Sequence, residues 1–551
     1  MNPSFKSRFV VLVVLDGWGL AVKSPGNAIM QASVVNFDKY WASCPHTQLA
    51  ASGEAVGLPP SEVGNTEVGH LNIGAGRIVY QDLTRINMSI ADGSFFKNDV
   101  LLGAFAHARK NNSNLHYLGL LGAGGVHSSI EHLYALIQLA AREKFDRLYL
   151  HLFTDGRDSP VTGAATYVKD LKQIVAAEGV GKIATIMGRY WAMDRDRRWE
   201  RTEKAYKALT QGVGQLVKSP EEAIADSYNR GITDEFVKPS IIMNENSKPT
   251  AVIADNDAVI FFNFRVDRPR QLTYAFVAKD FGKLAGIWDY DPYQVVREGT
   301  HQPKAATAPT FQRRDALKNL YFAMMTQYGK AFVDKGALVA FPPERVALSL
   351  GRVISEAGLK QLMVSESEKE RFVTFYFNGQ QEVTFPGEER LIVPSPKVPT
   401  YDQKPEMSSR ELTDALLTKL KSDRDYAFVL VNYASPDMVG HTGNIGAAVK
   451  ACEAVDECVG RLANFVLAYD GTMLITADHG NVEQMINHST GTINTEHTAN
   501  PVPFIAVSKN LLERGQSLQS GILADIAPTV LSLLGLPIAD TMTGRNLLEN
   551  A

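Results

Sequence analysis

Short apolar runs separated by longer amphipathic segments set the pattern of this chain. Several of the runs are rich in β-branched residues, end in Gly or Asp, and precede segments of helical character. Buried parallel strands that alternate with helices produce this pattern. The runs predict strands at Phe9–Leu15, Leu148–Phe153, Lys182–Met187, Ala258–Asn263, Tyr426–Asn432 and Thr472–Thr476. The sequence therefore predicts an α/β protein with a mainly parallel sheet.

Two segments are predicted to join parts of the chain. Residues 296–314, VREGTHQPKAATAPTFQRR, are polar and show little hydrophobic periodicity, which is typical of a linker or a long surface loop. A second joint is expected near Arg77–Gln81. The sequence shows no internal repeat of 20 to 50 residues and no sustained heptads, so solenoids and coiled coils are set aside.

Composition narrows the class of protein further. The chain has 551 residues, of which 45% are hydrophobic and 21% charged, so it can bury a sizeable core and is not a disordered segment. Its net charge of −4 argues against wholesale nucleic-acid binding. The apolar run Phe9–Leu15 is too short to cross a bilayer and lacks a cleavage pattern, so we expect no membrane association. Three cysteines are too few for a disulfide framework, which favours a reducing, cytoplasmic location.

Carboxylates and imidazoles follow several of the predicted strands. Asp16 comes directly after the first strand; its simpler interpretation is a turn residue that caps the next helix. Asp437 and His441 are four residues apart, a spacing that places both on one face of a helical turn, for metal ligation or for a surface hydrogen bond. Asp478 and His479 follow another strand. His497 lies in a polar loop, where a lone histidine often has no special role.

Taken together, these positions supply three carboxylates and three imidazoles without a thiolate. That ligand set suits Mn²⁺, Mg²⁺ or Zn²⁺. Two metals about 3.5 to 4 Å apart stabilise the attacking and leaving oxygens of an in-line phosphoryl transfer. Thr66, in the glycine-punctuated stretch GNTEVGHLNIGAGR, offers a hydroxyl at a predicted helix start, where backbone N–H groups favour a phosphate. Its alternative role is a simple N-cap.

Ten sequence blocks resemble those of the cofactor-independent phosphoglycerate mutases, a family of the alkaline phosphatase superfamily. In chain order they are GNTEVGHLNIGAGR, GGVHS, DGRDSP, GRYWAMDRD, FNFRVDRPR, SEKERFVTFYFNG, VPSPKVPTYDQKPEMS, NYASPDMVGHTG, TADHGN and HTANPVPF. The resemblance implies an enzyme that interconverts 3-phosphoglycerate and 2-phosphoglycerate in glycolysis and gluconeogenesis without 2,3-bisphosphoglycerate. It also implies a monomer.

The resemblance assigns roles to individual residues. It implies two divalent metal ions, with Mn²⁺ the expected metal and Mg²⁺ or Zn²⁺ the alternatives. One metal is expected at Asp16, Thr66, Asp478 and His479, and the other at Asp437, His441 and His497. Thr66 would be the phosphorylated nucleophile, with Asp158 and Lys369 as its catalytic partners. The substrate would be bound by His127, Arg157, Asp158, Arg189, Arg195, Arg265, Arg268 and Lys369.

The arginine-rich residues Arg189–Arg201 have a simpler interpretation, a solvated face. Five arginines there lie among Asp194, Asp196 and Glu200, so the arginines can form ion pairs with acidic residues of the same run. Against that, a phosphoglycerate carries a phosphate and a carboxylate, and both match the planar fork of arginine. The substrate-binding interpretation is therefore chemically consistent.

Two departures from the family pattern stand out. Thr66 replaces the family serine in GNSEVGH, which keeps the hydroxyl and adds a methyl group. Gly122-Ala123 replaces Ser-Asp before GGVHS. Because metal coordination activates either hydroxyl, the mutase prediction is kept. The threonine also keeps open a metal-dependent phosphatase or phosphodiesterase of the same superfamily, and a catalytically silent phosphoglycerate-binding protein.

The order of these residues predicts a discontinuous domain organisation. Residues 1–80 and 315–551 are expected to form the metal-binding, alkaline-phosphatase-like catalytic domain. Residues 81–314, linkers included, are expected to form an inserted α/β domain that binds substrate.

Overall fold

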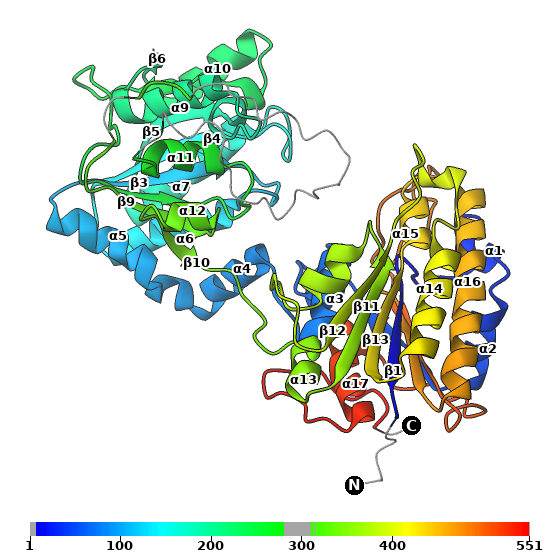
Figure 1. Ribbon diagram of the computed structural model, residues 1–551. Coiled ribbons are helices and arrows are strands. Elements are labelled where there is room, and N and C mark those ends of the chain that lie inside the picture. The colour runs from blue at the N-terminus through cyan, green and yellow to red at the C-terminus, as the bar shows by residue number, and fades with distance from the viewer. Residues whose placement is uncertain (1–6, 280, 282–309, 314–315, 550–551) are drawn as a thin grey trace. The chain divides into compact units, whose positions relative to one another are not determined.

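A computed structural model describes residues 7–279, 281, 310–313 and 316–549. The chain forms two compact units, and each is described by itself (Figure 1). Unit 1 consists of Met1–Gln81 and Glu344–Ala551, and unit 2 of Asp82–Pro343. Unit 1 is thus discontinuous in sequence, with unit 2 inserted into it.

An eight-stranded sheet forms the centre of unit 1. Its strand order is β12-β11-β13-β1-β14-β15-β2-β16, and its pairs are parallel except β14 with β15 and β15 with β2. The strand β1 is fully buried between β13 and β14, which explains its unbroken apolar sequence. The strands are β1 (Val10–Leu15), β2 (His46–Ala50), β11 (Lys360–Glu366), β12 (Glu388–Val393), β13 (Tyr426–Tyr433), β14 (Thr472–Thr476), β15 (Val502–Val507) and β16 (Gly521–Ile522).

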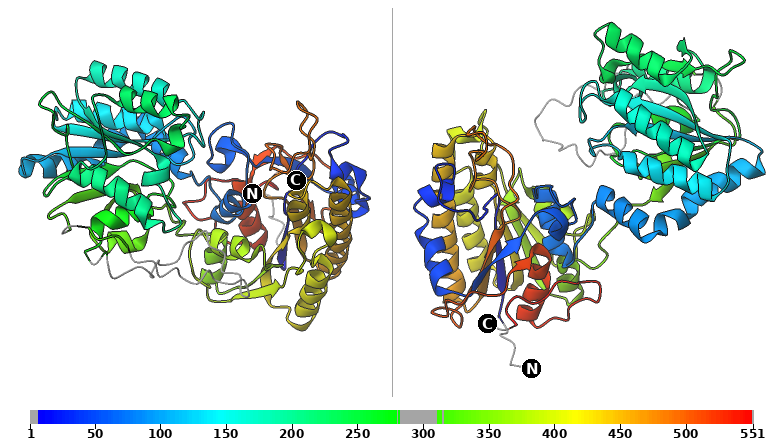
Figure 2. Two further views of the ribbon diagram at one scale, coloured as in Figure 1. Left: turned by 90° about the horizontal axis from the view of Figure 1, so that it is seen from above. Right: turned by 180° about the vertical axis from the view of Figure 1, so that it is seen from behind.

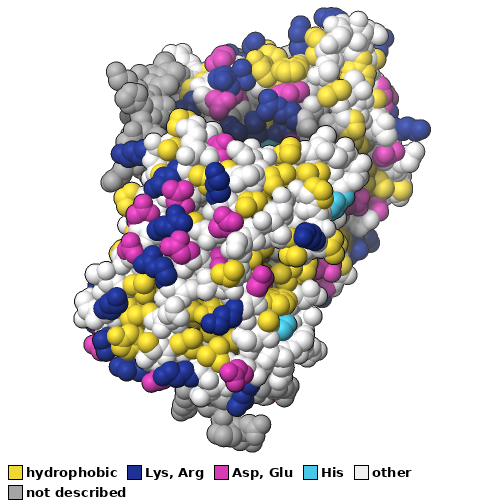
Figure 3. All heavy atoms as spheres, turned by 90° about the vertical axis from the view of Figure 1, so that its right-hand side faces the viewer, with side chains coloured by type: hydrophobic (Ala, Val, Ile, Leu, Met, Phe, Trp, Pro, Cys, Tyr) yellow, Lys and Arg dark blue, Asp and Glu magenta, His cyan; other side chains and the backbone are white. Residues whose placement is uncertain are grey.

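Helices cover both faces of this sheet (Figure 1). The long α16 packs with α14 on one face, and α3, α13 and α17 pack together on the other. Ion pairs such as Arg410–Glu457 link α14 to α16 and leave basic and acidic side chains intermixed on the face in Figure 3. The helices are α1 (Ala28–Gln31), α2 (Val35–Ser43), α3 (Thr66–Ala75), α13 (Leu350–Glu356), α14 (Ser409–Ser422), α15 (Ser435–Gly440), α16 (Ile445–Ala468) and α17 (Ile526–Leu534).

A second eight-stranded sheet forms the centre of unit 2. Its order is β10-β9-β8-β3-β4-β5-β7-β6, and every pair is parallel except β5 with β7. The strands are β3 (Leu115–Leu121), β4 (Leu148–Thr154), β5 (Lys182–Gly188), β6 (Gln215–Val217), β7 (Ser240–Ile242), β8 (Ala258–Phe261), β9 (Tyr321–Thr326) and β10 (Leu338–Phe341).

Alternating side chains of this sheet pack into two separate hydrophobic cores, one on each face. Ala258 and Ile260 of β8 pack with α4, α5, α6, α7 and α10, whereas Val259 and Phe261 pack with α8, α9, α11 and α12. Figure 2 shows these layers in two further views. The helices are α4 (Asp82–Asp92), α5 (Asp99–Lys110), α6 (Ile130–Arg142), α7 (Ala164–Glu178), α8 (Arg189–Ala192), α9 (Trp199–Gln211), α10 (Pro220–Asn229), α11 (Arg270–Val277) and α12 (Lys330–Val333).

The α/β prediction is confirmed, and all six predicted strands are present, as β1, β4, β5, β8, β13 and β14. The chain returns from unit 2 to unit 1 between residues 343 and 344, later than the expected boundary between residues 314 and 315. The reason is that β9 and β10 extend the sheet of unit 2, with β9 paired to β8. The expected linker at 296–314 lies outside the described residues except for 310–313. Among the described residues, no helix has the length and apolar character needed to cross a membrane.

Candidate functional site

One edge of the unit 1 sheet gathers the acidic and imidazole residues. Asp16 follows β1, Asp437 lies in α15 just beyond β13, and Asp478 and His479 follow β14. Because these three strands are parallel neighbours, their carboxyl ends meet at that edge. His497 precedes β15, which runs antiparallel to β14 and therefore begins at the same edge.

The Thr66 hydroxyl lies within this cluster, at the first residue of α3. The N-cap of that helix is Asn65, whose side chain accepts a hydrogen bond from the backbone N–H of Val68. The alternative that Thr66 serves as the N-cap is therefore wrong, and its side chain is left for other contacts. Thr66 Oγ1 lies 3.0 Å from Lys369 Nζ and 3.0 Å from His479 Nε2.

Lys369 connects the hydroxyl to two carboxylates. Its side chain is buried three residues after β11, and Nζ donates to Asp16 Oδ1 at 2.7 Å, to Asp437 Oδ2 at 2.8 Å and to Thr66 Oγ1. An ammonium group has three hydrogens, so all of them are used. Burial opposes the charge, but the surrounding carboxylates, Asp16 first, raise the pKa of Lys369 above its ordinary value. It is therefore a fixed positive charge beside Thr66.

Two of the carboxylates, Asp16 and Asp437, are held in different electrostatic states. Burial, followed by the neighbouring Asp478 carboxylate, raises the pKa of Asp16 to about 6. Burial also acts to raise the pKa of Asp437, but Lys369 and the imidazoles of His441 and His497 hold it well below its ordinary value.

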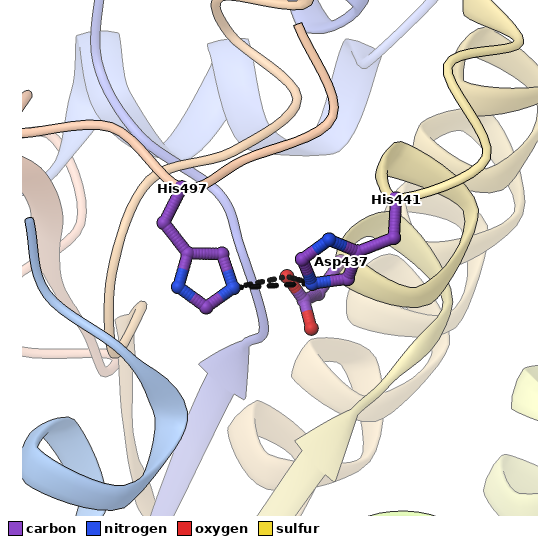
Figure 4. Close-up of side chains that lie close together, drawn as sticks. All are labelled: Asp437, His441 and His497. Atoms are coloured by element: carbon purple, nitrogen blue, oxygen red, sulfur yellow. Dashed lines mark hydrogen bonds and ion pairs between the residues drawn. The ribbon is translucent and has the colours of Figure 1, made fainter. Parts of the chain in front are cut away.

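His441 and His497 present the same ring atom to Asp437. Their Nε2 atoms lie 3.3 and 3.4 Å from Asp437 Oδ1 and 3.1 Å from each other (Figure 4). Each Nδ1 lies within hydrogen-bond distance of a backbone carbonyl, Thr495 at 2.7 Å and Gly64 at 2.9 Å. Because a carbonyl can only accept, each Nδ1 carries a proton, so Nε2 is the ring atom that a neutral imidazole would offer to a metal.

These groups fit bound divalent cations. Asp16, Asp437 and Asp478 carry three negative charges against one positive charge on Lys369, which leaves two negative charges in a buried site. Asp478 Oδ2 is buried without a hydrogen-bond partner among the described residues. Three triads have ligand atoms within 4.8 Å of one another: Asp437, His441 and His497; Asp16, Asp437 and His479; and Asp16, His70 and Asp478. A divalent cation would neutralise this excess charge and use the imidazole lone pairs.

Sequence analysis did not single out His70 and Asn432, although both lie in motifs that it quoted. Nδ1 of His70 lies 3.0 Å from the Thr66 carbonyl oxygen, and its Nε2 lies 3.1 Å from Asn432 Nδ2. The same Asn432 amide donates to Asp16 Oδ2 at 2.7 Å. These two side chains therefore connect the first turn of α3 to a carboxylate at the end of β1. A local pattern could not reveal that link, because its partners are separated by hundreds of residues.

A second cluster lies in unit 2 and is centred on Arg189. This buried guanidinium donates through Nη1 to Asp155 Oδ1 and to Asp158 Oδ2, both at 2.5 Å. His127 Nε2 lies 3.8 Å from Asp158 Oδ2. Burial, followed by the positive charge of Arg189, lowers the pKa of His127 to about 4, so its imidazole is neutral near pH 7. The cluster thus holds a carboxylate between an arginine and a neutral histidine.

Further arginines surround Asp267 in the same unit. Arg195 Nη1 donates to Asp267 Oδ2 at 2.7 Å, and Arg265 Nε lies 3.5 Å from Asp267 Oδ1. The Nε atoms of Arg268 and Arg189 are buried without hydrogen-bond partners in the part of the chain that the structure describes. Such donors fit an anion with several oxygens. The more exposed Arg157 pairs with Glu235 at 2.8 Å.

The solvated-face interpretation of Arg189–Arg201 holds for part of the run. Arg198 pairs with Asp196 at 2.6 Å, and both Arg198 and Arg201 lie 3.5 Å from Asp194. Arg189 and Arg195 instead point to carboxylates outside the run. The structure thus places seven predicted substrate residues in unit 2, and Lys369 with the predicted metal ligands in unit 1.

Comparisons with known proteins match nearly the whole chain. The family model described as BPG-independent PGAM N-terminus (iPGM_N) matches residues 86–330. A protein of Moorella thermoacetica named 2,3-bisphosphoglycerate-independent phosphoglycerate mutase is 50% identical over 542 residues, covering 98% of each chain. A protein of the same name from Chloroflexus aurantiacus is 50% identical over 552 residues, covering 98% of this chain and 99% of that one. Among solved structures, Leishmania mexicana phosphoglycerate mutase at low cobalt concentration matches with a TM-score of 0.59 and 28% identity, covering 99% of this chain and 98% of that one.

Proposed function

The chain belongs to the family of 2,3-bisphosphoglycerate-independent phosphoglycerate mutases, and we propose that it interconverts 3-phosphoglycerate and 2-phosphoglycerate through a phosphoenzyme at Thr66. The observation that carries the proposal is the position of the Thr66 hydroxyl, 3.0 Å from both Lys369 Nζ and His479 Nε2 at the start of α3. A phosphoryl group attached there would meet the N-terminal N–H groups of the helix and a fixed ammonium.

The activity depends on divalent metal. Two ions, with Mn²⁺ as the expected metal and Mg²⁺ or Zn²⁺ as alternatives, are part of the proposal. Asp16, Thr66, Asp478 and His479 would hold one, and Asp437, His441 and His497 the other. When bound, such ions lower the pKa of a ligated hydroxyl and offset charge that develops on a phosphoryl group. Support comes from the net negative charge of the buried carboxylates and from the imidazole groups that lie beside them.

In the first transfer, Thr66 Oγ1 attacks the phosphorus of 3-phosphoglycerate. The bond between phosphorus and the substrate O3 breaks, and the proton that Thr66 loses is carried by Asp158 to the departing O3, which becomes a hydroxyl. In the second transfer the glycerate O2 attacks the phosphothreonine, and Asp158 carries the proton of O2 back to Thr66 Oγ1, which restores the Thr66 hydroxyl and gives 2-phosphoglycerate. Lys369, in contact with Thr66 Oγ1, offsets negative charge in both transfers.

The arginines of unit 2 are proposed to hold the substrate while its two oxygens exchange roles. Arg157, Arg189, Arg195, Arg265 and Arg268 offer guanidinium groups for the phosphate and the carboxylate. The hydrogen bond between Arg189 and Asp158 supports this arrangement, because it joins the proposed proton carrier to a proposed anion-binding group. His127, neutral near pH 7, can donate a hydrogen bond without adding charge.

An enolase-coupled assay tests the proposal. Purified protein with 3-phosphoglycerate and Mn²⁺, without 2,3-bisphosphoglycerate, should form 2-phosphoglycerate, and EDTA should stop it. Free phosphate is followed in parallel. Free phosphate without 2-phosphoglycerate would favour a phosphatase, and neither product would favour a silent binding protein.

Substitutions at the nucleophile sharpen this test. Thr66→Ala should abolish mutase activity, because it removes the hydroxyl, whereas Thr66→Ser should preserve or raise it. The control is Cys452→Ser, since Cys452 is a buried thiol on α16 without a role in the proposed site. An active alanine variant would exclude Thr66 as the nucleophile.

The proposal also includes the location and the oligomeric state of the protein. All three cysteines are buried and free, which is consistent with a reducing compartment, and we infer a cytoplasmic location. We also propose that the enzyme is a monomer without nucleic-acid partners; light scattering of the purified protein would test the oligomeric state.

A further inference from the structure

Glu483 is a buried carboxylate that touches none of the proposed metal ligands directly. It lies in the loop after β14, and its side chain is completely buried. We propose that Glu483 is a positioning residue that fixes the three loops carrying the metal ligands and thereby sets the affinity for metal. The inference rests on the metal dependence proposed above and adds a residue outside both ligand sets.

Four donors from three chain segments converge on this carboxylate. Oε2 accepts the backbone N–H groups of Gly19 at 3.1 Å and Asn481 at 2.8 Å. Oε1 accepts the side-chain amide of Asn500 at 3.0 Å and the hydroxyl of Thr498. An ionised carboxylate only accepts hydrogen bonds, so it satisfies all four donors at once.

Each donor lies within three residues of a proposed ligand. Gly19 is three residues after Asp16, Asn481 is two residues after His479, and Thr498 directly follows His497. Single backbone hydrogen bonds also join these segments in pairs: the Thr498 N–H donates to the Gly480 carbonyl at 3.0 Å, the Val482 N–H to Gly17 at 3.1 Å, and the Leu20 N–H to Pro501 at 2.7 Å. Glu483 differs from these pairwise links because all three segments donate to its one carboxylate.

The connection also reaches the second ligand set. Asn481, whose backbone N–H binds Glu483, donates through its side chain to Asp437 Oδ1 at 3.0 Å. Asp437 is the carboxylate that faces both His441 and His497. A displacement of Glu483 would therefore be transmitted to ligands of both proposed ions.

Two glycines show how closely the loops fit around the carboxylate. A Cβ at Gly19 would lie 2.3 Å from the Glu483 carboxyl carbon, and one at Gly480 would lie 2.5 Å from Oε1. Both loops thus approach to a distance that only glycine allows, which gives the carboxylate no room to shift. Metal–ligand distances tolerate deviations of only about 0.2 Å, so this rigidity bears directly on affinity.

The test is Glu483→Gln, which keeps the shape and replaces one accepting oxygen by an amide donor. That donor would face either two backbone N–H groups or the Thr498 and Asn500 pair. We expect the dissociation constant for Mn²⁺, measured by the electron paramagnetic resonance of free Mn²⁺, to rise about 10- to 100-fold. The KM for 3-phosphoglycerate at saturating Mn²⁺ should change by less than about threefold, since the arginines of unit 2 are untouched.

Glu388→Gln is the matched control. Glu388 is another buried glutamate of unit 1, at the start of β12, where it accepts from Asn378 at 2.9 Å, Phe385 N–H at 3.2 Å and Arg390 at 2.9 Å. This variant should bind Mn²⁺ as the parent protein does, even if its melting temperature falls. Equal Mn²⁺ affinity in Glu483→Gln and the parent protein would overturn the proposal, whatever happens to stability.

Thr498→Val serves if Glu483→Gln fails to fold. It removes a single donor to Glu483 and should weaken Mn²⁺ binding several-fold; unchanged binding in this variant would also overturn the proposal. A parent protein that binds no Mn²⁺ would instead refute the proposed metal dependence, so the two failures are distinguishable.

Discussion

Replacing Lys369 by methionine should separate the structural role of its charge from its role in the reaction. Methionine keeps most of the volume and removes the ammonium that contacts Asp16 Oδ1 at 2.7 Å and Asp437 Oδ2 at 2.8 Å. Both carboxylates are buried, so each would lose its nearest positive charge in a low-dielectric site. Removing one partner of a buried ion pair costs about 3–5 kcal/mol.

This cost should appear in the metal-free protein. In EDTA, a loss of about 3–5 kcal/mol corresponds to a fall in melting temperature on the order of 10 °C for a unit of this size. Saturating Mn²⁺ should reduce the difference, because the ions then neutralise the same carboxylates. Mutase activity should not return with Mn²⁺, since the contact of Lys369 Nζ with Thr66 Oγ1 is lost.

Scanning calorimetry with and without EDTA measures the first effect, and the enolase-coupled assay measures the second. Lys360→Met is the control: Lys360 is 44% exposed and pairs with Asp423 at 3.3 Å on the surface of the same unit, so its loss should cost about 0–1 kcal/mol. A metal-free Lys369→Met protein that melts within about 2 °C of the parent would refute the electrostatic argument.

Three further predictions concern other sites. Burial raises the pKa of Glu366 to about 7, so the folded state holds the proton of this carboxyl group more tightly than the unfolded state does. The contribution of the protonated Glu366 to the free energy of unfolding is therefore present at low pH and is lost as the pH rises from about 4.5 to about 7. Glu366→Gln should therefore stabilise the protein by up to about 3 kcal/mol at pH 8 and hardly at all at pH 4, and equal melting shifts at both pH values would contradict this. Asp155→Asn removes one of the two carboxylates that fix Arg189, so we expect the KM for 3-phosphoglycerate to rise about tenfold or more with a smaller change in kcat; an unchanged KM would count against a role for Arg189 in binding. Adding Mn²⁺ to the EDTA-treated protein should raise the melting temperature progressively with concentration, as binding to the folded state alone requires, whereas no shift would argue against a metal site in unit 1.

Local patterns along the chain were sufficient for the fold class and for six of the sixteen described strands. Strand β1 could be recognised because a parallel strand buried on both faces is apolar at every position. The residues after β1, β13 and β14 could be expected near one another because parallel strands share a carboxyl edge. The motifs that resemble the mutase family are also local, so they could be read directly from the sequence.

Contacts between distant segments were decided only by the tertiary structure. The boundary at 343/344 depends on β9 and β10 pairing into the sheet of unit 2, and strand pairing is set by partners far away in sequence. The position of Lys369 between two carboxylates joins residues 353 and 68 positions apart. Glu483 looks like an ordinary acidic residue in the sequence, and its importance comes from donors at Gly19 and Asn500 that folding brings to it. The sequence alone thus determined which chemical groups the protein carries, whereas the three-dimensional packing decided which of them act together.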